Sequence, residues 1–473
     1  MKKIQLLPLL LLLAFSGIAQ DDYELVTIGG WDNDSLPTHF YGTFNDIWGY
    51  AAPDGREYAL LGSAAFVHII DVTEPTNYVE IERFEGGVST VWRDMKTYQD
   101  RMYACSDNSG EGLIIVDLSD LPNSATKTYQ SDEFFGSAHD IFIDEANARL
   151  YVVGGPGSMV ILDISSPDNP QFLAQHNLQG TYIHDLYVRD NIAYCSSAWD
   201  GLFVWDLTDA TNPILMATLE TNGYNHSNWV SEDGNTIIVA EEVPTGLPLL
   251  MVDATNLMDN DLTIQATFVD PNIANAPAMD PDGNNLDMYA TPHNPYILGD
   301  LAFVSYYEDG VVVFDISDPT APVKVAVTDT HPKNDDPNDL ANYGYHGYAG
   351  CWGIYPFLPS GNIIFSDFDT GLTAQELIVT PPVSTNELPT NINKFNIRPT
   401  PAGDFLTVKM ESSQAETVFL KMTDMNGRQV MATTSTINGA QTEILDVSSL
   451  SAGMYFLSLS GKDHITTRKV VKK

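Results

Sequence analysis

Four of the ten histidines occupy the same position in a repeated pattern. Two of them stand directly before an aspartate, in His139-Asp140 and His184-Asp185, and the other two are His226 and His293. Imidazole nitrogens and carboxylate oxygens are ligands for zinc, manganese and iron in proteins. One interpretation is therefore a metal site, in which the four imidazoles converge and the aspartates are nearby carboxylates.

A structural role explains the same pattern without a ligand. A side chain that forms a hydrogen bond within its own repeat is needed in every repeat, whereas one metal ion does not need a ligand from each. The recurrence of histidine at one position therefore favours residues that hold the repeats in place. Bound transition metal would distinguish the two interpretations.

A pair of glutamates follows His226 in the same repeat. Glu241 and Glu242 end an apolar segment where other repeats carry glycine or serine. One of the pair is placed to face the predicted mouth beside His226 and His184, and we include Glu241 among the candidate metal ligands. A solvated pair at the end of a strand is the simpler alternative.

An insertion at 257–290 is rich in Asp, Asn and Pro. It contains the segment DPDGNNLD, whose oxygen ligands would be Asp280, Asp282, Asn284 and Asp287. Carboxylate and amide oxygens around a glycine turn are typical of calcium loops. The segment lacks the closing glutamate of the twelve-residue calcium loop, so a surface Pro-Asp-Gly turn explains it equally well.

The candidate residues belong to a unit that recurs along the chain. Its clearest copy is GSMVILDISSPDNP at 157–170, in which four apolar residues precede Asp163, Ser165 and a proline-bounded turn. Equivalent acidic residues follow one another at intervals of 46, 46, 43, 47, 62 and 61 residues, at Asp71, Asp117, Asp163, Asp206, Asp253, Asp315 and Glu376. A period near 45 with strand-like content is typical of β-propeller blades.

The composition of one unit explains why it is repeated. Four consecutive apolar residues, many of them β-branched, predict a strand that is buried on both faces. The aspartate accepts hydrogen bonds from following amides, and proline ends the strand. One such sheet cannot cover its own faces, so we predict an all-β fold with a seven-bladed β-propeller, four strands per blade and the first strand innermost.

An additional strand precedes the first complete unit. The segment at 21–34 is similar to the last strand of a unit, so the N-terminus is expected to complete the final blade. Such a strand closes the ring without leaving an exposed sheet edge.

The two ends of the chain differ from the repeats. Residues 1–19 combine two lysines, an apolar run and small residues at the end, which predicts a signal peptide. No other stretch is long and apolar enough to span a membrane as a helix. Residues 20–380 are assigned to the propeller, residues 381–394 to a linker and residues 395–473 to a small β-sandwich domain.

Charge and cysteine content restrict the function further. The net charge of −41 argues against nucleic acid and anionic membranes as partners. Three cysteines are too few for a disulfide framework in an exported protein. Cys105, Cys195 and Cys351 stand at repeat positions, so we expect them to be small buried residues.

The C-terminal region carries the segments IRPTPAGDFLTVKM, MTDMNGRQV, LDVSSLSAGMYFLSL and TTRKVVKK. With these segments, residues 395–473 resemble the type A C-terminal sorting domain of the type IX secretion system. The usual Asn-Pro of the first motif is Thr400-Pro401 here. Behind a signal peptide, the resemblance implies export by the type IX machinery, followed by release or attachment to surface lipopolysaccharide.

Long segments of the propeller region are also specific. They include NDIWGYAAPDGREYALLG, HDIFID, YIHDLYV, NHSNWVSEDG and the run from Trp352 to Gly361. With these segments, the region from Asp22 to about Val379 resembles the LVIVD-repeat, choice-of-anchor B family. The resemblance implies a location at the cell surface and supplies no catalytic residue.

Three functions are consistent with these observations. The first is a secreted or cell-surface propeller that binds a protein or glycan over its mouth without catalysis, with a divalent metal at the mouth or calcium in the loop as candidate cofactors. The second is a metal-dependent hydrolase or lyase with the four histidines as ligands and Glu241 or Asp185 as the base. The third is a purely structural envelope protein.

Overall fold

The computed structural model describes residues 22–39, 42–87, 89–108, 110–180, 182–270, 289–331, 348–380, 392–398, 402–424, 428–451, 453–460 and 465–473. The expected signal peptide and nearly all of the expected linker lie outside these residues. The expected calcium loop, with Asp280, Asp282, Asn284 and Asp287, lies outside them as well.

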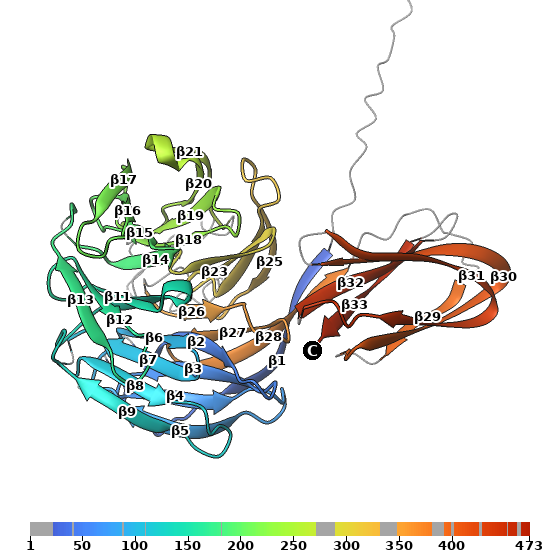
Figure 1. The fold of residues 1–473 in the computed structure, drawn as a ribbon, viewed down its shortest axis with the longest axis horizontal. Helices are drawn as coiled ribbons and strands as arrows, with labels where there is room; N and C mark the ends of the chain where they lie inside the picture. Colours follow the sequence, from blue (N-terminus) through green and yellow to red (C-terminus); the bar gives the residue numbers. More distant parts are fainter. Residues whose placement is uncertain are drawn as a thin grey trace, which may run out of the picture.

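Seven antiparallel sheets of four strands form a ring in the described part of the chain (Figure 1). The first blade contains β2 (Phe44–Ala51), β3 (Glu57–Ser63), β4 (Phe66–Asp71) and β5 (Val79–Glu85). The second contains β6 (Arg93–Tyr98), β7 (Arg101–Ser106), β8 (Leu113–Asp117) and β9 (Thr126–Ser131). The third contains β10 (Asp140–Asp144), β11 (Arg149–Val153), β12 (Met159–Asp163) and β13 (Gln171–His176). A short 3-10 turn, η1 (Glu145–Asn147), connects β10 to β11.

The next three blades follow the same order. The fourth contains β14 (Asp185–Arg189), β15 (Ile192–Ser196), β16 (Leu202–Asp206) and β17 (Ile214–Leu219). The fifth contains β18 (Asn225–Val230), β19 (Thr236–Glu241), β20 (Leu249–Asn256) and β21 (Asp261–Phe268), with the 3-10 turn η2 (Leu257–Asp259) between the last two strands. The sixth contains β22 (Pro295–Leu298), β23 (Leu301–Ser305), β24 (Val311–Asp315) and β25 (Val323–Thr328). The predicted seven-bladed propeller is therefore confirmed.

The seventh blade joins the two ends of the propeller. It contains β26 (Cys351–Tyr355), β27 (Asn362–Asp367) and β28 (Gly371–Thr380), and its outermost strand is β1 (Asp22–Trp31), which pairs antiparallel with β28. The expected N-terminal strand thus closes the ring. Because β1 covers the free edge of β28, this blade has as many strands as the others.

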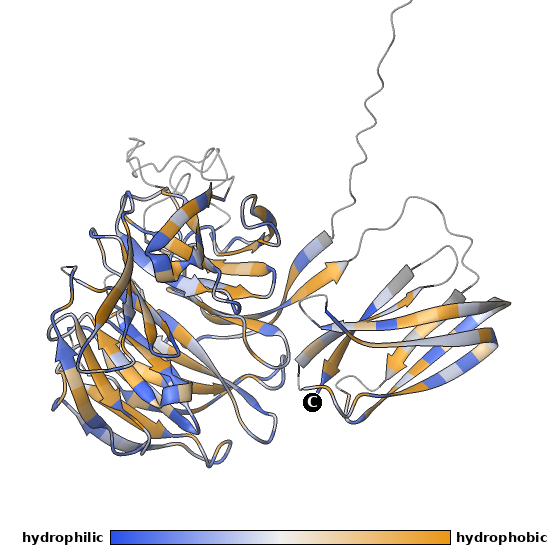
Figure 2. Cartoon of the chain, turned by 45° about the horizontal axis from the view of Figure 1, so that its top comes forward, coloured by the Kyte–Doolittle hydropathy of each residue, from blue (hydrophilic) through white to orange (hydrophobic). Residues whose placement is uncertain are grey.

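Burial follows the predicted pattern within each blade. The second and third strands are almost entirely buried, as in β3, whereas the outermost strand β13 is exposed or partly exposed at all positions but one. Figure 2 shows apolar residues concentrated along the strands of the blades. Cys105, Cys195 and Cys351 are buried, as expected.

The acidic residue that ends the third strand makes the predicted turn. The Oδ1 atom of Asp163 accepts a hydrogen bond from the amide of Ser165 at 2.8 Å. The same bond, to the residue two positions later, is formed by Asp71, Asp117, Asp206, Asp253 and Asp315. The recurring Asp-x-Ser/Thr segment is therefore a turn that ends the strand.

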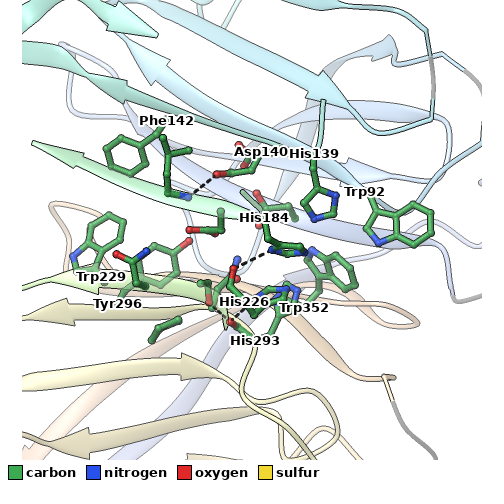
Figure 3. Close-up of a pocket in the computed structure, with 18 of the residues that line it drawn as sticks. Trp92, His139, Asp140, Phe142, His184, His226, Trp229, His293, Tyr296 and Trp352 are labelled. Carbon is green, nitrogen blue, oxygen red and sulfur yellow. Dashed lines mark hydrogen bonds between the residues drawn. The ribbon is translucent and has the colours of Figure 1, made fainter. Parts of the chain in front are cut away.

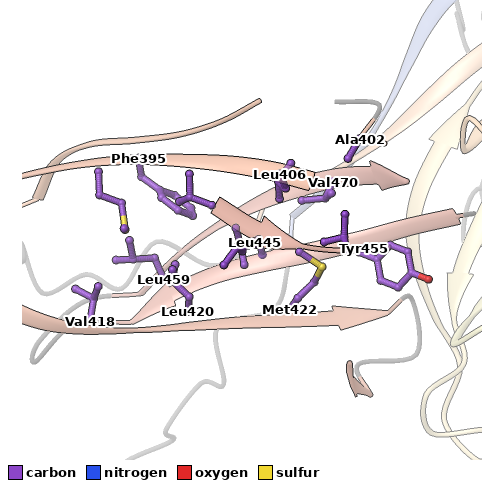
Figure 4. Close-up of a cluster of buried hydrophobic side chains, with 14 of the residues drawn as sticks. Phe395, Ala402, Leu406, Val418, Leu420, Met422, Leu445, Tyr455, Leu459 and Val470 are labelled. Atoms are coloured by element: carbon purple, nitrogen blue, oxygen red, sulfur yellow. The ribbon is translucent and has the colours of Figure 1, made fainter. Parts of the chain in front are cut away.

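A single curled sheet follows the propeller. Its strands are β29 (Ile392–Arg398), β30 (Phe405–Asp424), β32 (Gly453–Ser460) and β33 (Ile465–Lys472) in that order, with β31 (Gln429–Asp446) also paired to β30. The sheet encloses its own core, which includes Phe395, Leu406, Leu420 and Leu459 (Figure 4). The expected small β-sandwich takes this curled form. Lys469 of this domain lies 2.7 Å from Glu376 of the propeller.

Candidate functional site

The innermost strands surround a channel whose lining changes along its length (Figure 3). In the third blade the order is His139, Asp140, Ile141 and Phe142, and the other blades repeat this register. One end therefore carries Arg93, His139, His184, His226, His293 and Trp352. The middle carries Asp46, Asp94, Asp140, Asp185, Ser227 and Asn294, and the other end carries Phe142, Trp229 and Tyr296.

The four predicted histidines are adjacent to one another at the first end, and we call them the histidine stack. The centroids of neighbouring rings are 4.2 Å apart for His139 and His184, 4.1 Å for His184 and His226, and 4.3 Å for His226 and His293. Trp352 continues the series, 4.3 Å from His293. The structure thus places the four predicted imidazoles next to one another in a row.

The position equivalent to histidine in the last blade is Trp352. Alignment of the repeats by sequence alone puts Cys351 at this position, one residue too early. The ladder between β26 and β27 has an irregularity between Cys351 and Gly353, which shifts the register by one residue. Repeat spacing alone does not reveal such a bulge.

Hydrogen bonds join the histidine stack to the backbone of neighbouring blades. The Nδ1 atom of His184 lies 3.0 Å from the carbonyl oxygen of His226, and that of His226 lies 3.1 Å from the carbonyl oxygen of His293. A carbonyl can only accept, so Nδ1 carries the proton and Nε2 keeps a free lone pair. The hydrogen bond made by Nδ1 is the structural role that we expected for these residues. It leaves Nε2 unprotonated, which is the form of the atom that can bind a metal ion.

Burial favours the neutral form of His184, His226 and His293. It lowers the pKa of His184 and of His293 well below 6.5, and neighbouring imidazoles lower both further. It also lowers the pKa of His226, although Glu242 opposes the shift. Neutral imidazole is the form that binds metal ions.

The glutamate beside the histidine stack is Glu242. Its Oε2 atom lies 3.8 Å from Nε2 of His226, and its Oε1 atom accepts a 2.6 Å hydrogen bond from the hydroxyl of Tyr307. Among the described residues, His226, His293 and Glu242 place ligand atoms within 4.8 Å of one another.

The predicted ligand Glu241 points elsewhere. It is fully buried and accepts a hydrogen bond from the amide of Gly223. Consecutive residues of a strand face opposite sides, so only one of the two glutamates faces the stack. The sequence shows that Glu241 and Glu242 must face opposite sides, but it does not show which of them faces the mouth of the channel.

The aspartates form a second group in the middle of the channel. Asp94 accepts a hydrogen bond from the amide of Ile141 at 2.9 Å, and Asp140 accepts one from the amide of Leu186 at 3.2 Å, so each carboxyl joins two blades. The ammonium group of Lys96 lies 2.5 Å from Asp94 and 3.9 Å from Asp140. Sequence analysis did not predict this lysine, because it occupies a position that is aromatic in most blades.

Several of these carboxyls hold protons more tightly than usual. Burial raises the pKa of Asp46 and of Asp140 well above 3.8, and the charge of Asp94 raises both further. Burial raises the pKa of Asp185 to about 7, with Lys96 acting in the opposite direction. Asp140 and Asp185, predicted as metal ligands, therefore belong to the group around Lys96.

Aromatic side chains surround the histidine end, and we call them the aromatic rim: Tyr182, Trp199, Tyr224 and Tyr348. Tyr224 contacts His184 edge to face at 5.4 Å, and Trp199 contacts Tyr224 at 5.5 Å. Trp199 is 62% exposed. The rim therefore connects the buried histidine stack to the surface.

A ring of seven four-stranded blades around a polar channel defines a β-propeller. The LVIVD repeat model matches residues 136–177, 180–221 and 296–330, and the secretion system C-terminal sorting domain matches residues 396–473. The chain therefore carries LVIVD repeats in its propeller and a type IX sorting domain at its C-terminus. The sorting domain indicates that the type IX secretion machinery exports the protein, which is therefore secreted or located at the cell surface.

A solved structure of a bacterial surface protein is similar to the chain over most of its length. It is PorZ of Porphyromonas gingivalis, described as an essential surface component of the type IX secretion system, with 12% identity and a TM-score of 0.45. The match covers 93% of this chain and 61% of PorZ. A likeness at this level carries no functional argument. A search of curated proteins found no match.

Among the described residues, no helix has the length and apolar character that crossing a bilayer requires.

Proposed function

We propose that the protein is a non-catalytic binding module that is exported to the cell surface and binds a neutral glycan over the histidine end of the channel. The observation that carries this proposal is the exposed ring of Trp199, held edge to face by Tyr224 at the rim of that end. A large exposed aromatic residue beside a concave polar site is characteristic of ligand-binding surfaces.

The charge of the protein favours a neutral ligand. The chain has a net charge of −41, so its field repels anionic polymers and anionic glycans. The apolar face of a neutral pyranose suits an aromatic ring, and its hydroxyl groups suit nearby carboxylates and amides.

The lengths of the connections between blades also favour the histidine end of the channel as the binding face. The two longest connections between blades join β21 to β22 and β25 to β26, an outermost strand to the next innermost strand in each case. Their described ends, at 269–270, 289–294, 329–331 and 348–350, therefore lie at the end of the channel where the histidines lie. Long insertions concentrated on one face of a propeller are typical of its binding face.

A glycan array with the full-length protein tests this proposal. We expect binding to neutral glycans that Trp199→Ala reduces at least tenfold, whereas Phe172→Ala leaves it unchanged. Phe172 is a suitable control because it is 53% exposed on the outermost strand β13. Binding that responds equally to both substitutions, or no binding to any glycan, would overturn the proposal.

A metal-dependent hydrolase or lyase is the second candidate, and the convergence of His226, His293 and Glu242 favours it. The bases predicted for this reaction are not beside the imidazoles, since Glu241 bonds to Gly223 and Asp185 belongs to the group around Lys96. Turnover of ester, phosphoester or glycoside substrates with added metal would support this candidate, if Glu242→Gln abolished it.

A further inference from the structure

We infer that His226, His293 and Glu242 bind one divalent transition metal ion at the histidine end of the channel. The proposed ligand atoms are Nε2 of each imidazole and Oε2 of the carboxylate. Each of the three residues has a possible ligand atom within 4.8 Å of those of the other two. This inference goes beyond glycan binding and does not depend on it.

The two imidazoles are oriented before any ion binds. Nδ1 of His226 is held by the carbonyl oxygen of His293 at 3.1 Å, and Nδ1 of His293 by the carbonyl oxygen of Trp352 at 2.6 Å. A hydrogen bond from Nδ1 to a backbone carbonyl is the usual support for a histidine that binds metal through Nε2. Both rings are also buried, at 3% exposure each, so little rotational entropy remains to be lost.

The carboxylate is supported in the same way. The hydroxyl of Tyr307 donates to Oε1 of Glu242 at 2.6 Å, while Oε2 lies on the side of His226 at 3.8 Å. Ligand atoms of a tetrahedral zinc site are about 3.4 Å apart. Binding of an ion therefore requires the three side chains to move closer together than the 4.8 Å within which they lie. Tyr307 is then a positioning residue that keeps one oxygen occupied and leaves the other for the ion.

The chemistry of the ligands selects the class of metal. Two imidazoles and one carboxylate suit zinc, manganese or iron, whereas calcium and magnesium prefer sites made of oxygen alone. Three protein ligands leave at least one coordination position for water or for a group of a bound molecule. The other members of the stack, His139 and His184, are not among the three residues whose ligand atoms lie within 4.8 Å of one another.

Metal titration of the full-length protein tests the inference. After treatment with chelator, the protein is titrated with Zn²⁺ and with Mn²⁺ by calorimetry, and bound metal is measured after dialysis. We expect one ion per chain, with affinity lowered at least 100-fold by His293→Gln or Glu242→Gln and 10- to 100-fold by Tyr307→Phe. The matched controls His184→Gln and Glu241→Gln should bind as the wild type does.

A structural role alone predicts different results. Circular dichroism and urea denaturation verify that each variant is folded, and ¹⁵N spectra of the histidines should show metal-dependent shifts at two Nε2 atoms with the Nδ1 protons retained. Equal loss of metal in His184→Gln and His293→Gln, wild-type affinity in Glu242→Gln, or no stoichiometric ion in the folded wild type would each overturn the inference.

Discussion

The Nδ1 atom of His293 lies 2.6 Å from the carbonyl oxygen of Trp352, and the centroids of the two rings are 4.3 Å apart. This bond is the last of three that connect the fourth, fifth, sixth and seventh blades around the channel. The imidazoles therefore stabilise the ring through one nitrogen, which leaves the other available. A structural role and a binding role are compatible in the same side chain.

The histidine stack is expected to contribute to stability. His184→Ala leaves the buried carbonyl oxygen of His226 without its donor and opens a cavity, so we expect the free energy of unfolding to fall by about 2–4 kcal/mol. Urea denaturation measures this change. His139→Ala is the control, since its ring lies at the end of the stack and bonds to the side chain of Asp107, and it should cost about 1 kcal/mol. Equal costs would contradict the proposed blade-to-blade role.

The aspartate group is expected to make stability depend on pH. The pKa of Asp185 is raised to about 7, so between pH 4 and 7 the folded state holds a proton that the unfolded state has lost. The stability of the wild type therefore falls as pH rises through this window. Asp185→Asn removes the effect, and its stability relative to the wild type should rise with pH by up to about 1.4 kcal/mol per unit. The slope is expected below this limit because Asp185 is partly exposed.

Asp163, an aspartate in a turn, is a control whose effect on stability should depend on pH with the opposite sign. Hydrogen bonds from Ser165 lower the pKa of Asp163, so its contribution to stability is present above the unfolded pKa and is lost as pH falls below about 4. Urea denaturation of Asp185→Asn and Asp163→Asn across pH 3–8 should therefore give slopes of opposite sign in different windows. A flat difference for Asp185→Asn would contradict the raised pKa.

Arg93 is expected to be the most sensitive polar residue at the joint between the first two blades. Its buried guanidinium donates to the carbonyl oxygens of Ser63 and Ala64 at 2.7 and 2.9 Å, and to the hydroxyl of Ser106 at 2.6 Å. Arg93→Met removes all of these buried donors at once and should cost about 3–5 kcal/mol in thermal or urea denaturation.

Arg189 is the matched control for that substitution. It also donates to two backbone carbonyls of the next blade, but it is partly exposed. Water can replace the lost bonds there, so Arg189→Met should cost about 1 kcal/mol or less. Similar costs for the two substitutions would show that burial at Arg93 is unimportant.

The closure of the ring is expected to depend on Gln375. Its fully buried amide donates to Thr27 of β1 at 3.2 Å and to Thr328 of β25 at 2.8 Å, so it joins three strands. Gln375→Leu should accelerate hydrogen exchange in β1 about tenfold, which corresponds to a loss of about 1.4 kcal/mol. Exchange in β13, across the ring, should not change. Uniform acceleration in both strands would indicate global destabilisation instead.

The fold could be predicted from the sequence because its determinants are local and repeated. Asp163 and Ser165 mark a strand end by a turn that requires only two residues, and the same turn recurs in six blades. The candidate site could be predicted only in part. The position of the histidines follows from the repeat, but the choice between Glu241 and Glu242 depends on which face of β19 meets the channel.

Contacts that depend on one blade only were missed for a related reason. Lys96 occupies a position that is aromatic in other blades, so repetition gives no reason to expect its ammonium group among the aspartates. The position of Trp352 was missed because the last blade has no histidine to mark it, so alignment by sequence alone points to Cys351, one residue earlier. These details depend on packing between residues that are distant in the chain, and such packing cannot be inferred from a single sequence.

The pairing of β1 with β28 also determines how the protein would bear mechanical load. A pull on the C-terminal tail enters the propeller at Thr380, the last residue of β28. This strand is not at an edge, because β27 is bonded on one side and β1 on the other. Tension along it must shear two hydrogen-bonded ladders together, whereas an edge strand would be resisted by only one. A molecule tethered by its C-terminal end would therefore be held at a strand that its own N-terminus reinforces.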